Sequence, residues 1–417
     1  METHLADWLA DTADGREAES ILRSCVHCGF CTATCPTYQL LGDELDGPRG
    51  RIYLIKQVVE GVAPTEATRT HLDRCLSCRS CESTCPSGVR YGRLLDIGRR
   101  LVDVQLRRPL PERLMRAALR GGLTRRGVFG AAMRTGQAVR GVLPRGLREK
   151  VPARRPVGAW PTGHHPRKVL MPQGCVQPSM LPSVDAATAR VLDAIGVQAL
   201  LVTESGCCGA IQHHLDDTEG ALAQARRNID VWWPRVAAAQ AEGIEAILVN
   251  ASGCTLMLKE YAHLLRDDPA YAAKAERVSA LVRDIAEWLP AELEAALARK
   301  TLTVRRAPPG RVAYHPPCTL QHGQRVRGQV ERLLRAMGAE LQPVADAHLC
   351  CGSAGTYSVL QARLSRQLRA RKLVALEAQR PEMLLSSNVG CITHLQAGTG
   401  TPVRHWVEWV DEAIRET

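Results

Sequence analysis

ESGCCGAIQHHL, residues 204–215, contains two adjacent cysteines followed by glycine, and AHLCCGSAGTYS, residues 347–358, contains the same arrangement. Adjacent cysteines are poorly suited to a disulfide with each other, because linking neighbours strains the geometry that the bond prefers. The two pairs therefore point to another use. The positions of the other twelve cysteines in this chain of 417 residues indicate what that use is.

The two pairs belong to an internal repeat in the C-terminal half of the chain. In each unit a first cysteine precedes the pair by 32 residues, and a last cysteine follows it by 46 residues in the first unit and 40 in the second. These positions are Cys175, Cys207, Cys208 and Cys254 in the first unit, and Cys318, Cys350, Cys351 and Cys391 in the second. KVLMPQGC, AILVNASGC, RVAYHPPC and MLLSSNVGC each join a short apolar run to a loop that carries a cysteine.

Helical segments separate these apolar runs. TARVLDAIG and VERLLRAMG have apolar residues three and four positions apart, which predicts a helix, and Gly196 and Gly338 are placed to end them. Strands that alternate with helices predict parallel α/β units with right-handed crossovers. Because parallel sheets bind ligands at the carboxyl ends of their strands, we expect every cysteine of both units to lie there.

The N-terminal cysteines form two runs, CVHCGFCTATCP at residues 25–36 and CLSCRSCESTCP at residues 75–86. Both have the C-x2-C-x2-C-x3-C-P spacing of bacterial ferredoxins, in which the fourth cysteine ligates the other cluster. The runs therefore predict two [4Fe–4S] clusters. The expected ligands are Cys25, Cys28, Cys31 and Cys85 for the first cluster, and Cys75, Cys78, Cys81 and Cys35 for the second.

Structural zinc is the alternative for these runs, because C-x2-C pairs also bind zinc, but zinc does not require the C-x3-C-P ending. His27 lies between two expected ligands, and we interpret it as a loop residue. RIYLIKQVVEG and THLDRC, between the runs, have helical patterns. We therefore predict an all-helical ferredoxin-type domain.

Composition places the chain among soluble globular proteins, with 45% hydrophobic and 23% charged residues. We find no apolar run long enough for a membrane span and no N-terminal signal peptide. The expected location is the cytoplasm, where disulfides are rare, so sixteen cysteines favour metal ligation.

The net charge of +11 comes from one segment. Between Arg107 and Arg155 there are fourteen Arg or Lys residues and two Glu residues. LRRPLPERLMRAALRGGLTRR places Leu106, Leu110, Leu114 and Ala118 on one helical face, which suits a membrane-surface or partner-docking helix. A solvated helix covering the ferredoxin domain is the alternative. Because Phe129 is the one aromatic residue between those arginines, we expect no nucleic-acid binding.

These patterns divide the chain into four parts. We predict a helical dicluster domain at residues 1–105, a basic helical segment and linker at 106–165, a first cysteine-rich α/β domain at 166–300 and a second at 309–417. No catalytic residue is predicted. The chain has no G-x-G-x-x-G after a strand, no P-loop motif and no G-x-S-x-G.

The C-terminal units resemble the cysteine-rich domain with a CCG signature, which occurs in heterodisulfide reductase and in several bacterial dehydrogenase subunits. The resemblance implies a platform for a non-cubane iron–sulfur cluster, whose closely spaced irons suit adjacent thiolates. The fuller form of that motif ends in C-x-x-C, but here Met257 and His394 replace the last cysteine. Each unit thus offers four thiolates, enough for one further cluster. His394 is a further candidate ligand, and the alternative is a cleft with zinc or no metal.

The whole arrangement is similar to the iron–sulfur subunits of glycolate oxidase, also called glycolate dehydrogenase. SCVHCGFCTATCPTYQLLGDELDGPRGRIYLIKQVVEG, ESGCCGA, CTLQHGQ and HLCCGSAGTY carry the resemblance. It implies a complex in which FAD-binding subunits oxidise glycolate to glyoxylate and this chain passes electrons to quinone, at the inner face of the cell membrane. A lactate, glycerol-3-phosphate or heterodisulfide oxidoreductase is the alternative.

Overall fold

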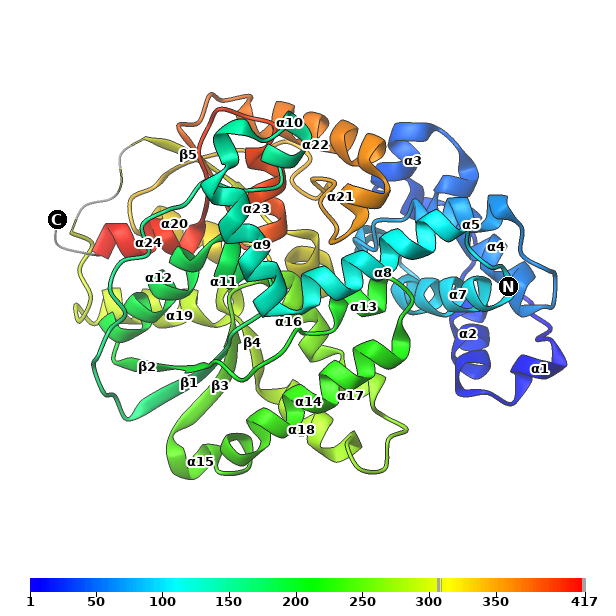
Figure 1. The fold of residues 1–417 in the computed structure, drawn as a ribbon, viewed down its shortest axis with the longest axis horizontal. Helices are drawn as coiled ribbons and strands as arrows, with labels where there is room; N and C mark the ends of the chain where they lie inside the picture. The colour runs from blue at the N-terminus through cyan, green and yellow to red at the C-terminus, as the bar shows by residue number, and fades with distance from the viewer. Residues whose placement is uncertain (306–307, 309, 415–417) are drawn as a thin grey trace.

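The computed structural model describes residues 1–305, 308 and 310–414. A helical N-terminal region is followed by a basic helical segment and by two parallel α/β units, which is the predicted fold class (Figure 1). In the described part of the chain, no helix combines the length and apolarity needed to cross a bilayer.

Four helices form most of the N-terminal region, and their apolar faces share one core. They are α2 (Ala13–Ser24), α4 (Pro48–Val59), α5 (Glu66–Asp73) and α7 (Tyr91–Gln105). The sequence specifies their starts: Thr12 accepts a hydrogen bond from the backbone of Gly15, and Pro48 occupies the first turn of α4. The shorter helices α3 (Pro36–Leu41) and α6 (Ser80–Thr84) carry the ends of the two cysteine runs.

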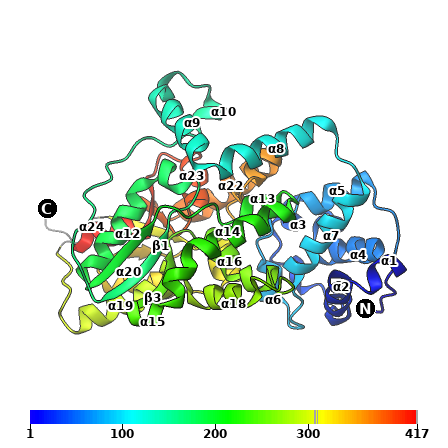
Figure 2. The same ribbon diagram turned by 60° about the horizontal axis from the view of Figure 1, so that its bottom comes forward.

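The basic segment forms α8 (Leu110–Thr124), α9 (Arg126–Ala138) and the short α10 (Arg145–Arg148). In Figure 2, α9 and α10 stand out from the rest of the molecule, and α8 runs back toward the N-terminal helices. Leu106 lies outside α8, because α7 ends there and Pro109 then starts the next helix. The side chains of Leu110 and Leu114 are each 62% exposed, so the predicted apolar face of α8 points to solvent.

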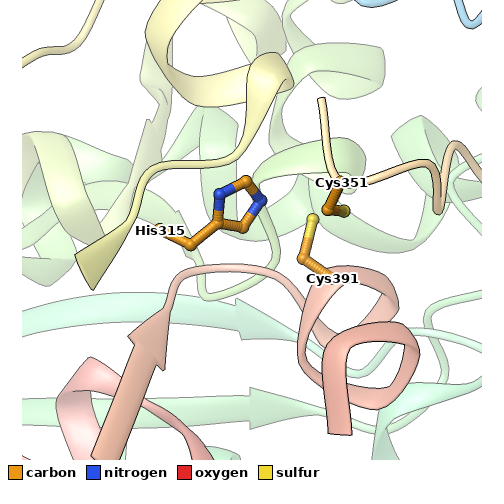
Figure 3. A group of neighbouring side chains, drawn as sticks. All are labelled: His315, Cys351 and Cys391. Atoms are coloured by element: carbon orange, nitrogen blue, oxygen red, sulfur yellow. The ribbon is translucent and has the colours of Figure 1, made fainter. Parts of the chain in front are cut away.

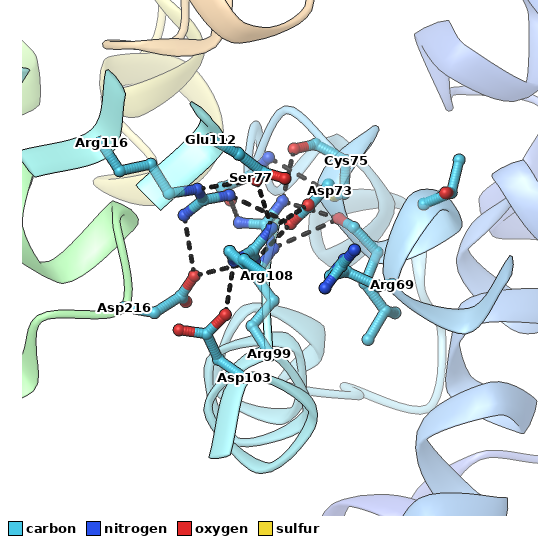
Figure 4. Close-up of polar contacts among 12 residues, drawn as sticks. Arg69, Asp73, Cys75, Ser77, Arg99, Asp103, Arg108, Glu112, Arg116 and Asp216 are labelled. Atoms are coloured by element: carbon cyan, nitrogen blue, oxygen red, sulfur yellow. Dashed lines mark hydrogen bonds and ion pairs between the residues drawn. The ribbon is translucent and has the colours of Figure 1, made fainter. Parts of the chain in front are cut away.

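Ion pairs hold the opposite face of α8 and Arg108, which lies just before this helix (Figure 4). Arg108 pairs with Asp73 of α5 at 2.6 Å, and Arg116 pairs with Asp216 at 3.1 Å. Glu112 contacts both arginines. Although burial raises the pKa of Asp73, the hydrogen bond and charge of Arg108 outweigh burial and leave that pKa below its ordinary value. Two arginines of the basic segment are therefore structural and unavailable to an external partner.

The first α/β unit has a four-stranded parallel sheet with the order β2–β1–β3–β4. Its strands are β1 (Arg167–Pro172), β2 (Val197–Val202), β3 (Ile244–Val249) and β4 (Val282–Asp284). Its longer helices are α12 (Pro182–Ala194), α14 (Thr218–Ala237), α16 (Ser252–Lys259), α18 (Ala272–Leu281) and α19 (Ile285–Ala298). The helix predicted from TARVLDAIG is α12, and Gly196 after it has a φ of 74°.

The second unit repeats this topology, with the order β6–β5–β7–β8 and parallel pairing throughout. Its strands are β5 (Arg311–His315), β6 (Glu340–Gln342), β7 (Met383–Ser386) and β8 (Val403–His405). Its helices include α20 (Gln329–Ala336), α22 (Ala362–Glu377), α23 (Val389–Gln396) and α24 (Trp406–Ile414). The internal repeat in the sequence is therefore a repeat of structure.

One apolar core joins the two units, because α12 contacts α24 and α19 contacts α20. Trp406 and Trp409 of α24 are fully buried in it. The domain boundaries at residues 105, 165, 300 and 309 stay predictions.

Candidate metal centres

The two ferredoxin-like runs share a backbone conformation. His27 and Ser77, each just before the second cysteine of its run, have φ values of 54° and 51°. Gly29 and Arg79, each just after that cysteine, have φ values of 85° and 58°. Non-glycine residues seldom adopt the left-handed region, and such strained positions gather where a loop encloses a ligand. Each run is thus bent into a tight loop around its own thiols.

The thiols of the two runs line two small cavities, and each cavity combines cysteines of both runs. Cys25, Cys28, Cys31 and Cys85 line the first, together with His27. Cys35, Cys75 and Cys78 line the second, and Cys81 lines both. Burial, followed by the charges of Cys25, Cys28 and Cys85, raises the pKa of Cys31 to about 11. Burial likewise raises the pKa of Cys81, with contributions from Cys78, Cys75 and Cys35. Cluster ligation by these eight thiols stays a prediction.

In both α/β units the cysteines follow the carboxyl ends of strands. Cys175 follows β1, the first CysCys pair follows β2, and Cys254 lies in the first turn of α16 after β3. The same sequence of positions recurs after β5, β6 and β7, with Cys391 in the first turn of α23. Four thiols from three separate loops therefore converge at one edge of each sheet.

The first unit holds its CysCys pair with buried hydrogen bonds. The Cys175 and Cys207 Sγ atoms lie 3.4 Å apart. Asn228 donates to the carbonyl of Cys207 at 2.8 Å, and Tyr261 donates to the carbonyl of Cys208 at 2.9 Å. Contacts from Cys175 and then Cys208 hold the pKa of Cys207 well below its ordinary value.

The second unit holds its pair differently. The backbone N–H of Gly352 donates to Cys350 Sγ at 3.4 Å, and Ser365 donates to the Gly352 carbonyl at 2.7 Å. Asn388 donates to Cys391 Sγ at 3.7 Å. His394, a candidate ligand from the sequence, has its Nε2 atom 3.2 Å from the Ser365 hydroxyl. That contact orients the His394 ring through its Nε2 atom.

Steric constraints favour glycine directly after each CysCys pair. Gly209 and Gly352 have φ values of 89° and 88°, which side chains disfavour. A Cβ atom on Gly352 would also lie 2.6 Å from the carbonyl oxygen of Ser365. Glycine therefore lets α22 approach the loop that presents the second pair.

All eight thiols of the α/β units open on one cavity of about 650 Å³. Cys75 and Cys78 of the N-terminal region line it as well. Cys318 contacts Cys350 and Cys78, and these contacts, the first more than the second, raise the pKa of Cys318. The spacing of the cysteines in the sequence did not predict this shared space.

His315 and Met257 also lie close to the cysteines of the two units. His315, the last residue of β5, offers a ring nitrogen within 4.8 Å of the sulfur atoms of Cys351 and Cys391. His315 precedes Cys318 by three residues in RVAYHPPC, and this spacing is the one signal in the sequence that connects it with the cysteines. Met257, which replaces the last cysteine of the first unit, is buried in the apolar core beside Tyr261.

The chain matches two known domain families. A cysteine-rich domain family matches residues 169–259 and 312–396, and a 4Fe–4S dicluster domain family matches residues 21–89. The glycolate oxidase iron–sulfur subunit of Escherichia coli is 51% identical over the full length of both chains. The chain belongs to the glycolate oxidase iron–sulfur subunit family. The probable member of this family in Bacillus subtilis is 31% identical over 92% of this chain and 90% of that protein.

Lactate utilization protein A of Geobacillus thermodenitrificans is a more distant relative. It is 28% identical to this chain over 57% of this chain and 95% of that protein. The donor set of the chain fits iron–sulfur clusters, because its sixteen cysteines are free thiols, most of them buried, that gather at these sites.

Proposed function

We propose that the chain is the electron-transfer iron–sulfur subunit of a glycolate-oxidising complex. FAD-binding partner subunits would oxidise glycolate to glyoxylate, and the chain would carry the electrons to quinone. The observation that carries this proposal is the pair of thiol-lined cavities in a chain related over its whole length to the Escherichia coli subunit. The relatedness to lactate utilization protein A favours lactate as the second candidate substrate of the complex.

Cys25, Cys28, Cys31 and Cys85 would hold one [4Fe–4S] cluster, and Cys75, Cys78, Cys81 and Cys35 the other. Such clusters, when bound, accept and donate single electrons. The cysteines must lose their protons to become ligands. Because burial raises the pKa of Cys31 and Cys81, burial favours the protonated form of these two thiols before a metal binds.

Each α/β unit would hold one further iron–sulfur cluster. Cys175, Cys207, Cys208 and Cys254 form the first donor set, and Cys318, Cys350, Cys351 and Cys391 form the second. The contact between Cys318 and Cys78 supports direct communication between the second unit and the N-terminal region. Zinc in either unit is the alternative.

The loop of the first run offers a contact surface for the electron donor. Cys28 is exposed, and the side chains of Val26 and Phe30 are 69% and 62% exposed. Exposed apolar residues around an expected cluster fit a flavin-containing partner that must approach closely. The outward apolar face of α8 supports peripheral contact with the inner face of the cell membrane.

The first experiment measures iron, acid-labile sulfide and activity on the full chain purified without oxygen. Two clusters require about eight irons per chain, and clusters in the α/β units would add more. We expect no glycolate oxidation with an artificial acceptor until the flavoprotein subunits are added, because the chain has no flavin-binding motif. Turnover by the chain alone, or fewer than about eight irons per chain after cluster reconstitution, would contradict the proposal.

A further inference from the structure

His315 is a buried histidine whose ring has no hydrogen-bond partner among the described residues. Its side chain is fully buried, and both Nδ1 and Nε2 lack a partner. Buried polar side-chain atoms are nearly always hydrogen-bonded, so an unpartnered imidazole indicates that something else binds it. Its position at the carboxyl end of β5 directs it toward the edge where the cysteines converge.

The neighbours of His315 are two thiols of the second unit. A ring nitrogen and the sulfur atoms of Cys351 and Cys391 all lie within 4.8 Å of one another (Figure 3). Metal–sulfur bonds of about 2.3 Å and metal–nitrogen bonds of about 2.0 Å place two ligands of one tetrahedral ion about 3.6 Å apart. Small side-chain rotations would bring these three donors onto a common metal.

The two units differ at this position. The residue three places before the first cysteine is His315 in the second unit and Pro172 in the first, and proline has no side-chain donor. His394 has its Nε2 atom 3.2 Å from the Ser365 hydroxyl and is not in the group of possible metal ligands with Cys351 and Cys391 among the described residues. A ligand from His315 would come from β5, before the first cysteine, and have no counterpart in the first unit.

We propose that His315 is a ligand to the metal of the second unit, beside Cys351 and Cys391. The inference rests on the proposed metal centre in that unit. A neutral imidazole nitrogen adds a ligand beside the thiolates without adding negative charge. The second centre would then have a nitrogen ligand that the first lacks, because Pro172 occupies the matching place there.

The test compares wild-type protein with the variants His315→Gln, His405→Gln and Cys351→Ser, each as the full chain reconstituted with ferrous iron and sulfide. His405 is the matched control, since it is also fully buried at the end of a strand but belongs to no group of possible metal ligands. Iron content, iron retention against a chelator and nitrogen hyperfine coupling in the reduced protein are measured.

We expect directly bound nitrogen coupling in wild-type protein and in His405→Gln, and its loss in His315→Gln. Deletion of the ligand should speed iron loss from the second unit about 10- to 100-fold. If Cys351→Ser lowers the iron content but His315→Gln keeps the coupling and the iron, the histidine ligand is overturned and the metal centre stands. If Cys351→Ser retains all the iron of wild type, the proposed centre fails, and the inference fails with it.

Discussion

Cys35 and Cys85 each end one run, yet each lies among the thiols of the other run. The cause is local: a three-residue spacing before the proline turns the fourth cysteine away from its own loop. Cys35 is buried and contacts the Thr37 hydroxyl at 3.3 Å. At the scale of a residue, the fourth cysteine of each run therefore lies with the thiols of the other run and not with its neighbours in sequence.

Cys35→Ser should disturb the same paramagnetic centre as Cys78→Ser. It should leave the centre that is changed by Cys28→Ser nearly intact, because Cys28 lies in the other group. Electron paramagnetic resonance of the reduced protein distinguishes the two centres. Loss of the Cys28-dependent signal in Cys35→Ser would show that the ligands are assigned to the wrong clusters.

At the scale of an element, α8 exposes apolar side chains and buries a charged one. Arg116 of α8, and Arg108 just before it, are buried against Asp73 and Asp216, while Leu110 and Leu114 face solvent. Arg108 and Arg116 each contact both Asp73 and Asp216, so removing both arginines would leave the two carboxylates without these partners. Breaking a buried ion pair typically costs about 3–5 kcal/mol. Neutralising all the arginines of α8 is therefore a poor test of membrane binding, since it would damage the fold.

Replacing the exposed leucines provides a cleaner test of that helix. The double variant Leu110→Ser, Leu114→Ser should bind vesicles with anionic lipids at least about tenfold more weakly than wild type. The reason is that two apolar side chains no longer enter the lipid interface. Val62→Ser is the matched control, with a side chain that is 54% exposed on a loop after α4. Sedimentation with vesicles measures binding, and iron content reports on the fold. Equal binding of both variants would exclude α8 as the membrane contact.

At the scale of the whole molecule, the helical domain and the second α/β unit meet at polar contacts beside the cysteines. The Ser83 hydroxyl and His322 Nδ1 lie 2.7 Å apart, and His322 Nε2 lies 2.8 Å from the His348 carbonyl. Tyr357 donates to the Arg74 carbonyl at 3.1 Å. These contacts keep Cys78 beside Cys318, so docking of the two parts is a condition for the shared cavity.

Acid should loosen this docking through His322. Burial lowers the pKa of His322 from 6.5 to about 4 in the folded protein. The undocked state therefore binds the proton first, and the contact weakens as pH falls from about 6.5 toward 4. Between pH 7.5 and 5.5, opening should become about tenfold more favourable.

Hydrogen exchange of residues 80–84 and 319–323, corrected for the intrinsic effect of pH, measures that opening. His322→Gln keeps one donor and one acceptor but does not titrate, so it should remove most of the pH dependence. The same tenfold change in the variant would assign the effect to other groups.

Features that depend on local spacing could be predicted from the sequence alone. Intervals between cysteines predicted two ferredoxin-like runs and two repeated units, and apolar periodicity predicted helices such as α12 and α20. These features follow from the sequence because cluster loops and helical turns involve residues only a few positions apart. The sequence also predicted that the cysteines of each unit lie at strand ends, since parallel topology imposes this.

Contacts across the boundaries between domains and units could not be predicted and are seen only in the folded chain. The contact of Cys78 with Cys318, the inward turn of Arg108 and the approach of His315 to Cys391 join residues at least 35 positions apart. A linear pattern carries no information on which faces of two elements meet, because that choice depends on the fit of whole surfaces. The N-terminal region and both units share one cavity because the apolar and charged faces of separate segments pack together, and no single motif contains those contacts.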